Sequence, residues 1–182
     1  MSRSVFIKAM HPETEVSPNS ASIEKILKAG WVGQEKIHGH RAQIHLHADA
    51  NEEIIAYTRQ GQPHTKLLPK EIIGELRRIF DLKNGWTVID TEWLKPENKL
   101  YVFDILKIND KLLRNLNYED RFNLIPRDYI SPYVKTLPLL TTKEKCLEVL
   151  ARSEKYIEGL VFKSLTTKGF EDTSIVRCRK RH

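Results

Sequence analysis

Cysteine is scarce in this sequence, and long apolar runs are missing from it. The two cysteines, Cys146 and Cys178, form neither a close pair nor a zinc-binding spacing, which argues against a disulfide framework and a structural zinc site. No apolar stretch approaches the roughly 20 residues that cross a bilayer, and the N-terminal apolar run is too short for a signal peptide. We therefore expect a soluble cytoplasmic protein with reduced thiols and no membrane association.

Internal repeats and low-complexity segments are also missing. With 40% hydrophobic and 30% charged residues, the 182-residue chain has the composition of a globular protein, and its length suits a single domain, residues 1–182. The net charge of +6 favours a polyanionic partner such as nucleic acid, a nucleotide or an anionic membrane. The alternative is that the chain is one of the many basic globular proteins that bind no particular polyanion.

The pattern of apolar residues predicts an α+β fold. Helical spacing predicts helices over residues 20–29, 69–80 and 141–153 and a helical turn over 117–123. β-rich runs predict strands over residues 43–47, 54–58, 86–94, 100–106, 157–164 and 174–179. The third and fourth strands should form a hairpin, and residues 130–140 should form an extended loop with an edge strand. Thr141 or Thr142 should cap the last helix, with Glu144 in a capping box. We expect mostly antiparallel sheets flanked by helices.

The stretch at residues 35–41, EKIHGHR, places a lysine three residues before a glycine. Lys36 lies between an apolar run and an alternating one, so it can sit at a strand edge facing a pocket. A lysine in surroundings that favour the neutral amine can act as a nucleophile. Taken alone, a solvated lysine in a turn made by Gly39 is the commoner explanation, since surface lysines outnumber reactive ones.

Polar groups at two further strands could bind a nucleotide. Arg59 ends an expected strand two residues before Gly61, and its fork of donors could bind phosphate unless it only meets solvent. Alternation places Asp90 and Glu92 on one face of the next strand. A metal, a ribose or a basic neighbour would compensate their buried charge, unless that face is exposed.

Aromatic and charged groups mark the remaining strands. Phe103 shares a face with Tyr101 and Ile105 and could stack on a base, although core packing is the commoner explanation.

Glu158 and Lys163 bracket an apolar strand, and Arg177 and Arg179 alternate onto one face of the last strand. One acid facing two cations could hold a magnesium–triphosphate group. The alternative for the C-terminal basic residues is a solvated tail or a nonspecific nucleic-acid contact.

The order of these elements resembles the covalent nucleotidyltransferase superfamily, which includes ATP-dependent DNA ligases, RNA ligases and messenger-RNA capping guanylyltransferases. The resemblance covers residues 31–179. In this family the lysine of a Lys-x-Asp-Gly element attacks the α-phosphate of ATP or GTP and holds the nucleoside monophosphate as a phosphoramide. The resemblance implies an ATP-grasp-like adenylyltransferase domain with Lys36 as the catalytic nucleophile.

The resemblance also implies the nucleotide-binding residues. Glu35 looks like the group beside the lysine that contacts adenine, and Arg59 looks like a contact to phosphate or ribose. Glu92 looks like the ribose-binding acid, Phe103 like the ring stacked on the base, and Glu158 like the metal-binding acid. The full set implied for nucleotide binding is Glu35, Ile37, Arg41, Arg59, Glu92, Phe103, Glu158, Lys163, Arg177 and Arg179.

Some positions depart from the family pattern. His38 replaces the usual aspartate, and both this Lys-x-His-Gly element and the TEWL sequence at residues 91–94 are similar to phage-type and editing-type RNA ligases. The Gly-x-Arg element at residues 39–41 instead resembles DNA ligases and capping enzymes. Arg177 and Arg179 stand where the family usually has a Lys-x-Lys pair on the α-phosphate. They cannot give up a proton as lysine can, but they supply fixed positive charge.

The resemblance implies an ATP-dependent polynucleotide ligase, with RNA slightly favoured over DNA. It would form lysyl-AMP, transfer AMP to a 5′-phosphate end and seal that end to a 3′-hydroxyl. ATP, Mg²⁺ or Mn²⁺ on Glu158, and a nicked duplex or RNA ends would be its cofactors and partners. The alternatives are a GTP-dependent capping guanylyltransferase and a noncatalytic nucleic-acid-binding module. We expect no C-terminal OB domain in this chain, so a C-terminal domain or a partner subunit could complete the enzyme.

Overall fold

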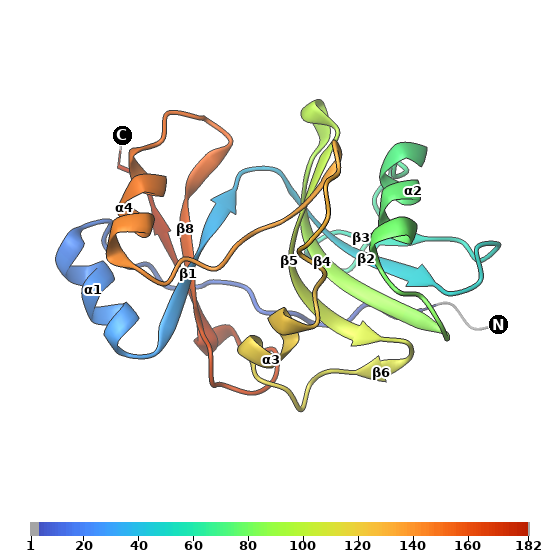
Figure 1. The fold of residues 1–182 in the computed structure, drawn as a ribbon, viewed down its shortest axis with the longest axis horizontal. Helices are drawn as coiled ribbons and strands as arrows, with labels where there is room; N and C mark the ends of the chain where they lie inside the picture. Colours follow the sequence, from blue (N-terminus) through green and yellow to red (C-terminus); the bar gives the residue numbers. More distant parts are fainter. Residues whose placement is uncertain (1–3, 182) are drawn as a thin grey trace.

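Two β-sheets face each other in the computed structural model, which describes residues 4–181 (Figure 1). Strands pair antiparallel within both sheets, except where β7 joins β5. The small sheet has the order β1-β8-β9, and its strands are β1 Trp31–Ile37, β8 Ile157–Ser164 and β9 Ile175–Arg179. The large sheet has the order β3-β2-β4-β5-β6 with β7 on β5, and its strands are β2 His40–His47, β3 Ile55–Tyr57, β4 Trp86–Leu94, β5 Lys99–Ile108, β6 Lys111–Leu112 and β7 Val134–Thr136.

Helices flank the two sheets (Figure 1). They are α1 Ser20–Lys28, α2 Lys70–Ile79, α3 Tyr118–Asn123 and α4 Lys143–Ala151, with short 3₁₀ helices at Lys95–Glu97 and Asp172–Ser174. α1 and α4 pack on the small sheet, where Ile23 and Cys146 join its apolar cluster. α2 buries Ile72 and Leu76 in the cluster of the large sheet. Across residues 4–181, every helix is too short or too polar to cross a lipid bilayer.

The architecture confirms the predicted α+β fold of antiparallel sheets and flanking helices, and each predicted helix and strand has a counterpart within a few residues. The predicted capping box is wrong. The Thr142 hydroxyl accepts from the backbone N–H of Lys145 at 3.2 Å, so Thr142 is the cap. Glu144 is then only the second residue of α4, one position too early to complete a capping box.

One connection places the two sheets around a common space. β1 and β2 follow each other in sequence but belong to different sheets, so the turn at His38 and Gly39 crosses between them. Gly39 fits this turn because a Cβ there would lie 2.6 Å from the carbonyl oxygen of Trp93. The turn therefore brings the end of β1, with Lys36, beside the start of β2, with Arg41.

Candidate active site

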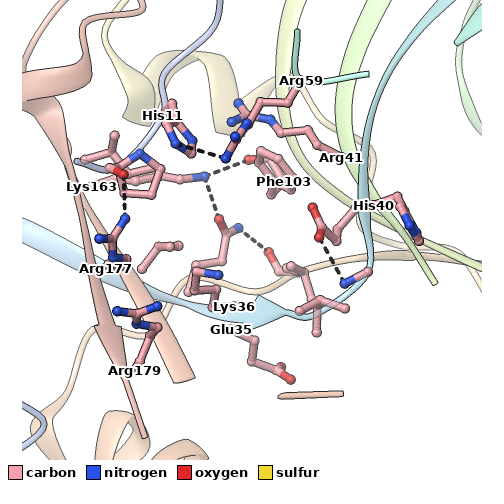
Figure 2. Close-up of a pocket in the computed structure, with 18 of the residues that line it drawn as sticks. His11, Glu35, Lys36, His40, Arg41, Arg59, Phe103, Lys163, Arg177 and Arg179 are labelled. Carbon is pink, nitrogen blue, oxygen red and sulfur yellow. Dashed lines mark hydrogen bonds between the residues drawn. The ribbon is translucent and has the colours of Figure 1, made fainter. Parts of the chain in front are cut away.

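A cavity of about 550 Å³ lies between the two sheets (Figure 2). Its walls come from β1, β8 and β9 of the small sheet and from β2, β4 and β5 of the large one. The sequence-predicted residues that line it are Glu35, Lys36, Ile37, Arg41, Arg59, Glu92, Phe103, Lys163, Arg177 and Arg179. Glu158 lines a neighbouring hollow of about 920 Å³ and touches Lys36 from there. The fold thus brings residues from six separate segments into one place.

The alternation of β1 divides its residues between two faces. Figure 2 shows the side chains of Glu35 and Lys36 pointing in different directions. The Glu35 carboxylate lies 3.3 Å from Arg152, and Ile37 is buried in the apolar cluster beneath α1 and α4. The Gln34 side chain faces Lys163. Gln34 also lines the site, and it was not predicted from the sequence. The signal was its position two residues before Lys36, because residues two apart on a strand share a face.

Lys36 is held by one acid. Its ammonium donates to Glu158, and the ring of His38 lies 3.7 Å from the same carboxylate oxygen. Burial raises the pKa of Glu158, but the hydrogen bond from Lys36 and the charges of Lys36, His38 and Arg179 outweigh burial, so the pKa is lowered overall. Lys36 lies opposite Gly159 of β8, where a Cβ would lie 2.8 Å from the Cα of Arg179. Glycine therefore lets β9 and its arginines approach the lysine.

Glu92 lies on the other side of the cavity. It accepts a hydrogen bond of 3.0 Å from the backbone N–H of Gly39. Burial raises the pKa of Glu92 to about 7, although this hydrogen bond and the charges of Arg41 and Lys36 oppose the rise. This carboxyl group can therefore donate or accept a hydrogen bond near neutral pH.

Arg41 is the basic neighbour of the two carboxylates on β4. It pairs with Asp90 in a two-pronged contact, Nε to Oδ1 at 3.0 Å and Nη2 to Oδ2 at 2.5 Å. Asp90 is buried, so the face of β4 that carries this carboxylate is not exposed to solvent, as the alternative explanation required. The Arg41 guanidinium also lies 5.3 Å from the centre of the Phe103 ring. Its charge is largely compensated, so its main effect is to fix Asp90 and Phe103.

A β-bulge sets the position of Phe103. Asp90 pairs with Asp104 and Thr91 pairs with Val102, so Phe103 is an extra residue on β5 that has no paired residue on β4. A bulge of this kind re-aims a side chain. The half-buried Phe103 side chain consequently lines the cavity.

A buried lysine lies against the Phe103 ring. Lys163 Nζ is 4.6 Å from the ring centre and donates to the Gln34 side-chain oxygen at 2.7 Å and to the Tyr118 hydroxyl at 3.1 Å. Burial lowers the pKa of Lys163 to about 7, with the Asp104 carboxylate the largest opposing influence. These contacts make Lys163 a support for Phe103 and Gln34.

The N-terminal segment supplies a further wall. His11 lines the cavity, and its ring nitrogen lies 3.3 Å from an Arg59 guanidinium nitrogen. Burial lowers the pKa of His11, and the charges of Arg59 and Arg41 lower it further. Glu15 pairs with both Arg177 and Arg179. No local sequence signal marks His11 or Glu15 as site residues, because neither lies in a regular element.

Comparisons with known proteins found a matching family and solved structures of similar fold. A family described as RNA ligase matches residues 29–180. Mycobacterial DNA ligase D complexed with ATP and MES has a similar fold, with a TM-score of 0.58 and 16% identity over 96% of this chain and 60% of that one. The ligase domain of LigD from M. tuberculosis gives a TM-score of 0.55 and 16% identity over 92% of this chain and 59% of that one. The chain thus spans about 60% of the length of these structures. No curated protein matches it.

Proposed function

The chain belongs to the RNA ligase family, and from this premise we propose that it is an ATP-dependent polynucleotide ligase, with RNA slightly favoured over DNA. The observation that carries the proposal is the placement of Lys36. Its amine contacts an acid, Glu158, and Lys36 lines the same cavity as the two arginines of β9 and the aromatic Phe103. ATP as the nucleotide is supported by the similar fold of a DNA ligase that binds ATP.

The first reaction forms a covalent lysyl-AMP. The Lys36 amine attacks the α-phosphorus of ATP, a P–N bond forms, and the P–O bond to pyrophosphate breaks. Glu158 holds the amine until the nucleotide arrives, and the amine must leave this ion pair and lose a proton before it attacks. Arg177 and Arg179 stabilise the charge that develops on the transferring phosphoryl group.

The nucleoside is bound on the large-sheet side of the cavity. The Phe103 ring stacks on the adenine, since Phe103 lines the cavity and its ring is supported by Lys163. Glu92 binds the ribose hydroxyls.

Two further transfers complete sealing. A 5′-phosphate attacks the lysyl-AMP and releases Lys36, which yields an adenylated strand. A 3′-hydroxyl then attacks that strand, forms the phosphodiester and expels AMP. The net charge of +6 suits a chain that also holds backbone phosphates.

A divalent cation fits beside Lys36. Within residues 4–181, no cluster of three or more acidic, histidine or cysteine side chains could hold a metal alone. Mg²⁺ commonly binds through one or two carboxylates together with substrate phosphates and water. Glu158, ionised and partly exposed, is therefore the residue that would hold Mg²⁺ or Mn²⁺ together with the nucleotide. The ion would neutralise charge on the phosphates.

Labelled nucleotides test the proposal. The protein is incubated with ATP or GTP labelled at the α-phosphate and with Mg²⁺, and retained label is measured after denaturing electrophoresis. We expect label from ATP, its loss in Lys36→Ala, and its retention in Lys28→Ala, which removes a lysine that is 77% exposed on α1.

Other outcomes would contradict the proposal in different ways. Label from GTP alone would indicate a capping-type guanylyltransferase. Salt-sensitive nucleic-acid binding without label from either nucleotide would indicate a noncatalytic module. Label retained by Lys36→Ala would refute the assignment of the nucleophile.

A further inference from the structure

The N-terminal strap, residues 10–16, lies outside the family match at residues 29–180 and yet forms a wall of the cavity. It runs across the molecule from the large sheet to the small one (Figure 1). It then pairs with β9 as a short parallel bridge. The backbone N–H of Arg177 donates to Thr14 at 3.0 Å, and the N–H of Val16 donates to the carbonyl of Arg177 at 2.8 Å. The strap is therefore fixed beside the two arginines of β9.

The Glu15 carboxylate occupies the point where these two arginines converge. One oxygen, Oε1, accepts from Arg177 Nε at 2.9 Å and also from Arg179 Nη2. The Arg177 guanidinium has a second contact with the strap, because its Nη1 donates to the carbonyl of Pro12 at 3.0 Å. Two guanidinium groups on one face of a strand repel each other unless an anion lies between them. Glu15 supplies that anion.

We propose that Glu15 stands in for a phosphoryl oxygen between Arg177 and Arg179, and that the nucleotide's phosphate must displace it to bind. Carboxylate and phosphate oxygens are alternative partners for a guanidinium fork. The proposal rests on the proposed function only where it calls the ligand a nucleotide. Glu15 is thus a residue that sets the affinity of the site for phosphate.

The consequence is a built-in competition. When a site is open for only a fraction of the time, its apparent dissociation constant is the intrinsic constant divided by that fraction. A nucleotide gains further contacts on Phe103 and Glu92 and therefore tolerates this loss. Inorganic phosphate lacks those contacts, so it needs a higher concentration to occupy the site than it would need without Glu15.

The direction in which one substitution changes phosphate affinity distinguishes this role from a purely structural one. Glu15→Gln keeps the size of the side chain and its hydrogen-bonding oxygen but removes the charge. If Glu15 competes with phosphate, binding becomes tighter in the variant. If Glu15 only orients the two arginines, binding becomes weaker.

The test is calorimetric binding of inorganic pyrophosphate to the full chain. We expect Glu15→Gln to lower the dissociation constant about two- to tenfold, because exposed ion pairs hold their partners only weakly. Glu15→Asp, which keeps the charge, should stay closer to wild type. Glu13→Gln is the matched control. It removes the same charge from an exposed position of the strap that has no ion pair among the described residues, and should change the constant less than Glu15→Gln does.

An unchanged or raised dissociation constant in Glu15→Gln would overturn the proposal, as would a lack of measurable pyrophosphate binding by both proteins. Pyrophosphate binding needs no chemical step. A wild-type protein that binds pyrophosphate but forms no lysyl-AMP would therefore contradict the proposed function and leave this inference standing.

Discussion

Glu92 shows how one buried acid couples the site to pH. Burial raises its pKa from 4.5 to about 7, while the Gly39 N–H and the charges of Arg41 and Lys36 only partly oppose the rise. Between these two pH values the folded protein holds a proton that the unfolded chain has released. The stability that Glu92 contributes is therefore complete below about pH 4.5 and is lost as the pH rises through about 7.

Glu92→Gln should remove this pH dependence, because glutamine resembles the protonated acid and can still accept from Gly39. We expect the variant and wild type to have similar free energies of unfolding near pH 4.5. At pH 8 the variant should be the more stable, by at most about 3 kcal/mol. Urea denaturation at a series of pH values measures this difference. A difference that did not vary with pH would contradict the raised pKa.

Another buried group titrates in part of the same range, and the comparison with wild type cancels it. Burial lowers the pKa of His45 to about 3, so His45 contributes stability that grows as the pH rises from about 3 to 6.5. This effect is present in wild type and in Glu92→Gln alike. The difference between the two proteins therefore reports on Glu92 alone.

Phe103 was open to two interpretations, base stacking and core packing, and one substitution distinguishes them. Phe103→Leu keeps an apolar side chain but removes the ring. Because stacking on a base is worth about 1–3 kcal/mol, we expect the KM for ATP in lysyl-AMP formation to rise about tenfold. The free energy of unfolding should change little. A lower free energy of unfolding with an unchanged KM would show that Phe103 is only a core residue.

Phe122→Leu provides the control for Phe103→Leu. Phe122 is buried in the core, away from the cavity lining. The same chemical change should there lower the free energy of unfolding by about 1 kcal/mol and leave the KM for ATP unchanged.

At the scale of the elements, the sequence predicted those helices and strands whose apolar spacing and turn residues lie within their own segment. α1 and α2 follow apolar spacing, and the β4–β5 hairpin follows two β-rich runs joined by a proline-containing turn. β1 has no such signal, because it buries the polar residues Gln34 and Glu35. Their partners, Lys163 and Arg152, lie more than 100 residues away in sequence. A strand stabilised in this way cannot be recognised from its own residues.

The bulge on β5 shows a second limit of strand periodicity. Strict alternation placed Tyr101, Phe103 and Ile105 on one face. The extra residue in the strand breaks the alternation, so Tyr101 packs in the cluster of the small sheet and Ile105 in that of the large one. The candidate nucleophile and its expected neighbours could be named from the sequence. The inward turn of Phe103, and the approach of His11 and Glu15 from the strap, depend on tertiary structure.

At the scale of the whole molecule, the basic charge and the position of the cavity predict how polynucleotides bind. The formal excess is six positive charges. If this excess neutralises six phosphates, the logarithm of affinity should fall with the logarithm of salt concentration with a slope of about −5. The phosphates are the same in RNA and in DNA, so this electrostatic contribution cannot distinguish the two.

Nicked duplexes that differ only in the sugar at the nick therefore separate binding from recognition. We expect RNA and DNA strands at the nick to give similar salt slopes, while the sealing rate is higher for the RNA strand. The reason is that discrimination must come from the 2′-hydroxyl and the A-form shape, which only the RNA strand presents. Sealing by wild type is measured on matched substrates at several salt concentrations, with Lys36→Ala as the inactive control. Faster sealing of the DNA strand would assign this member of the RNA ligase family to DNA. If the RNA and DNA substrates differed only in their salt slopes, the preference for one of them would come from phosphate contacts and not from recognition of the sugar.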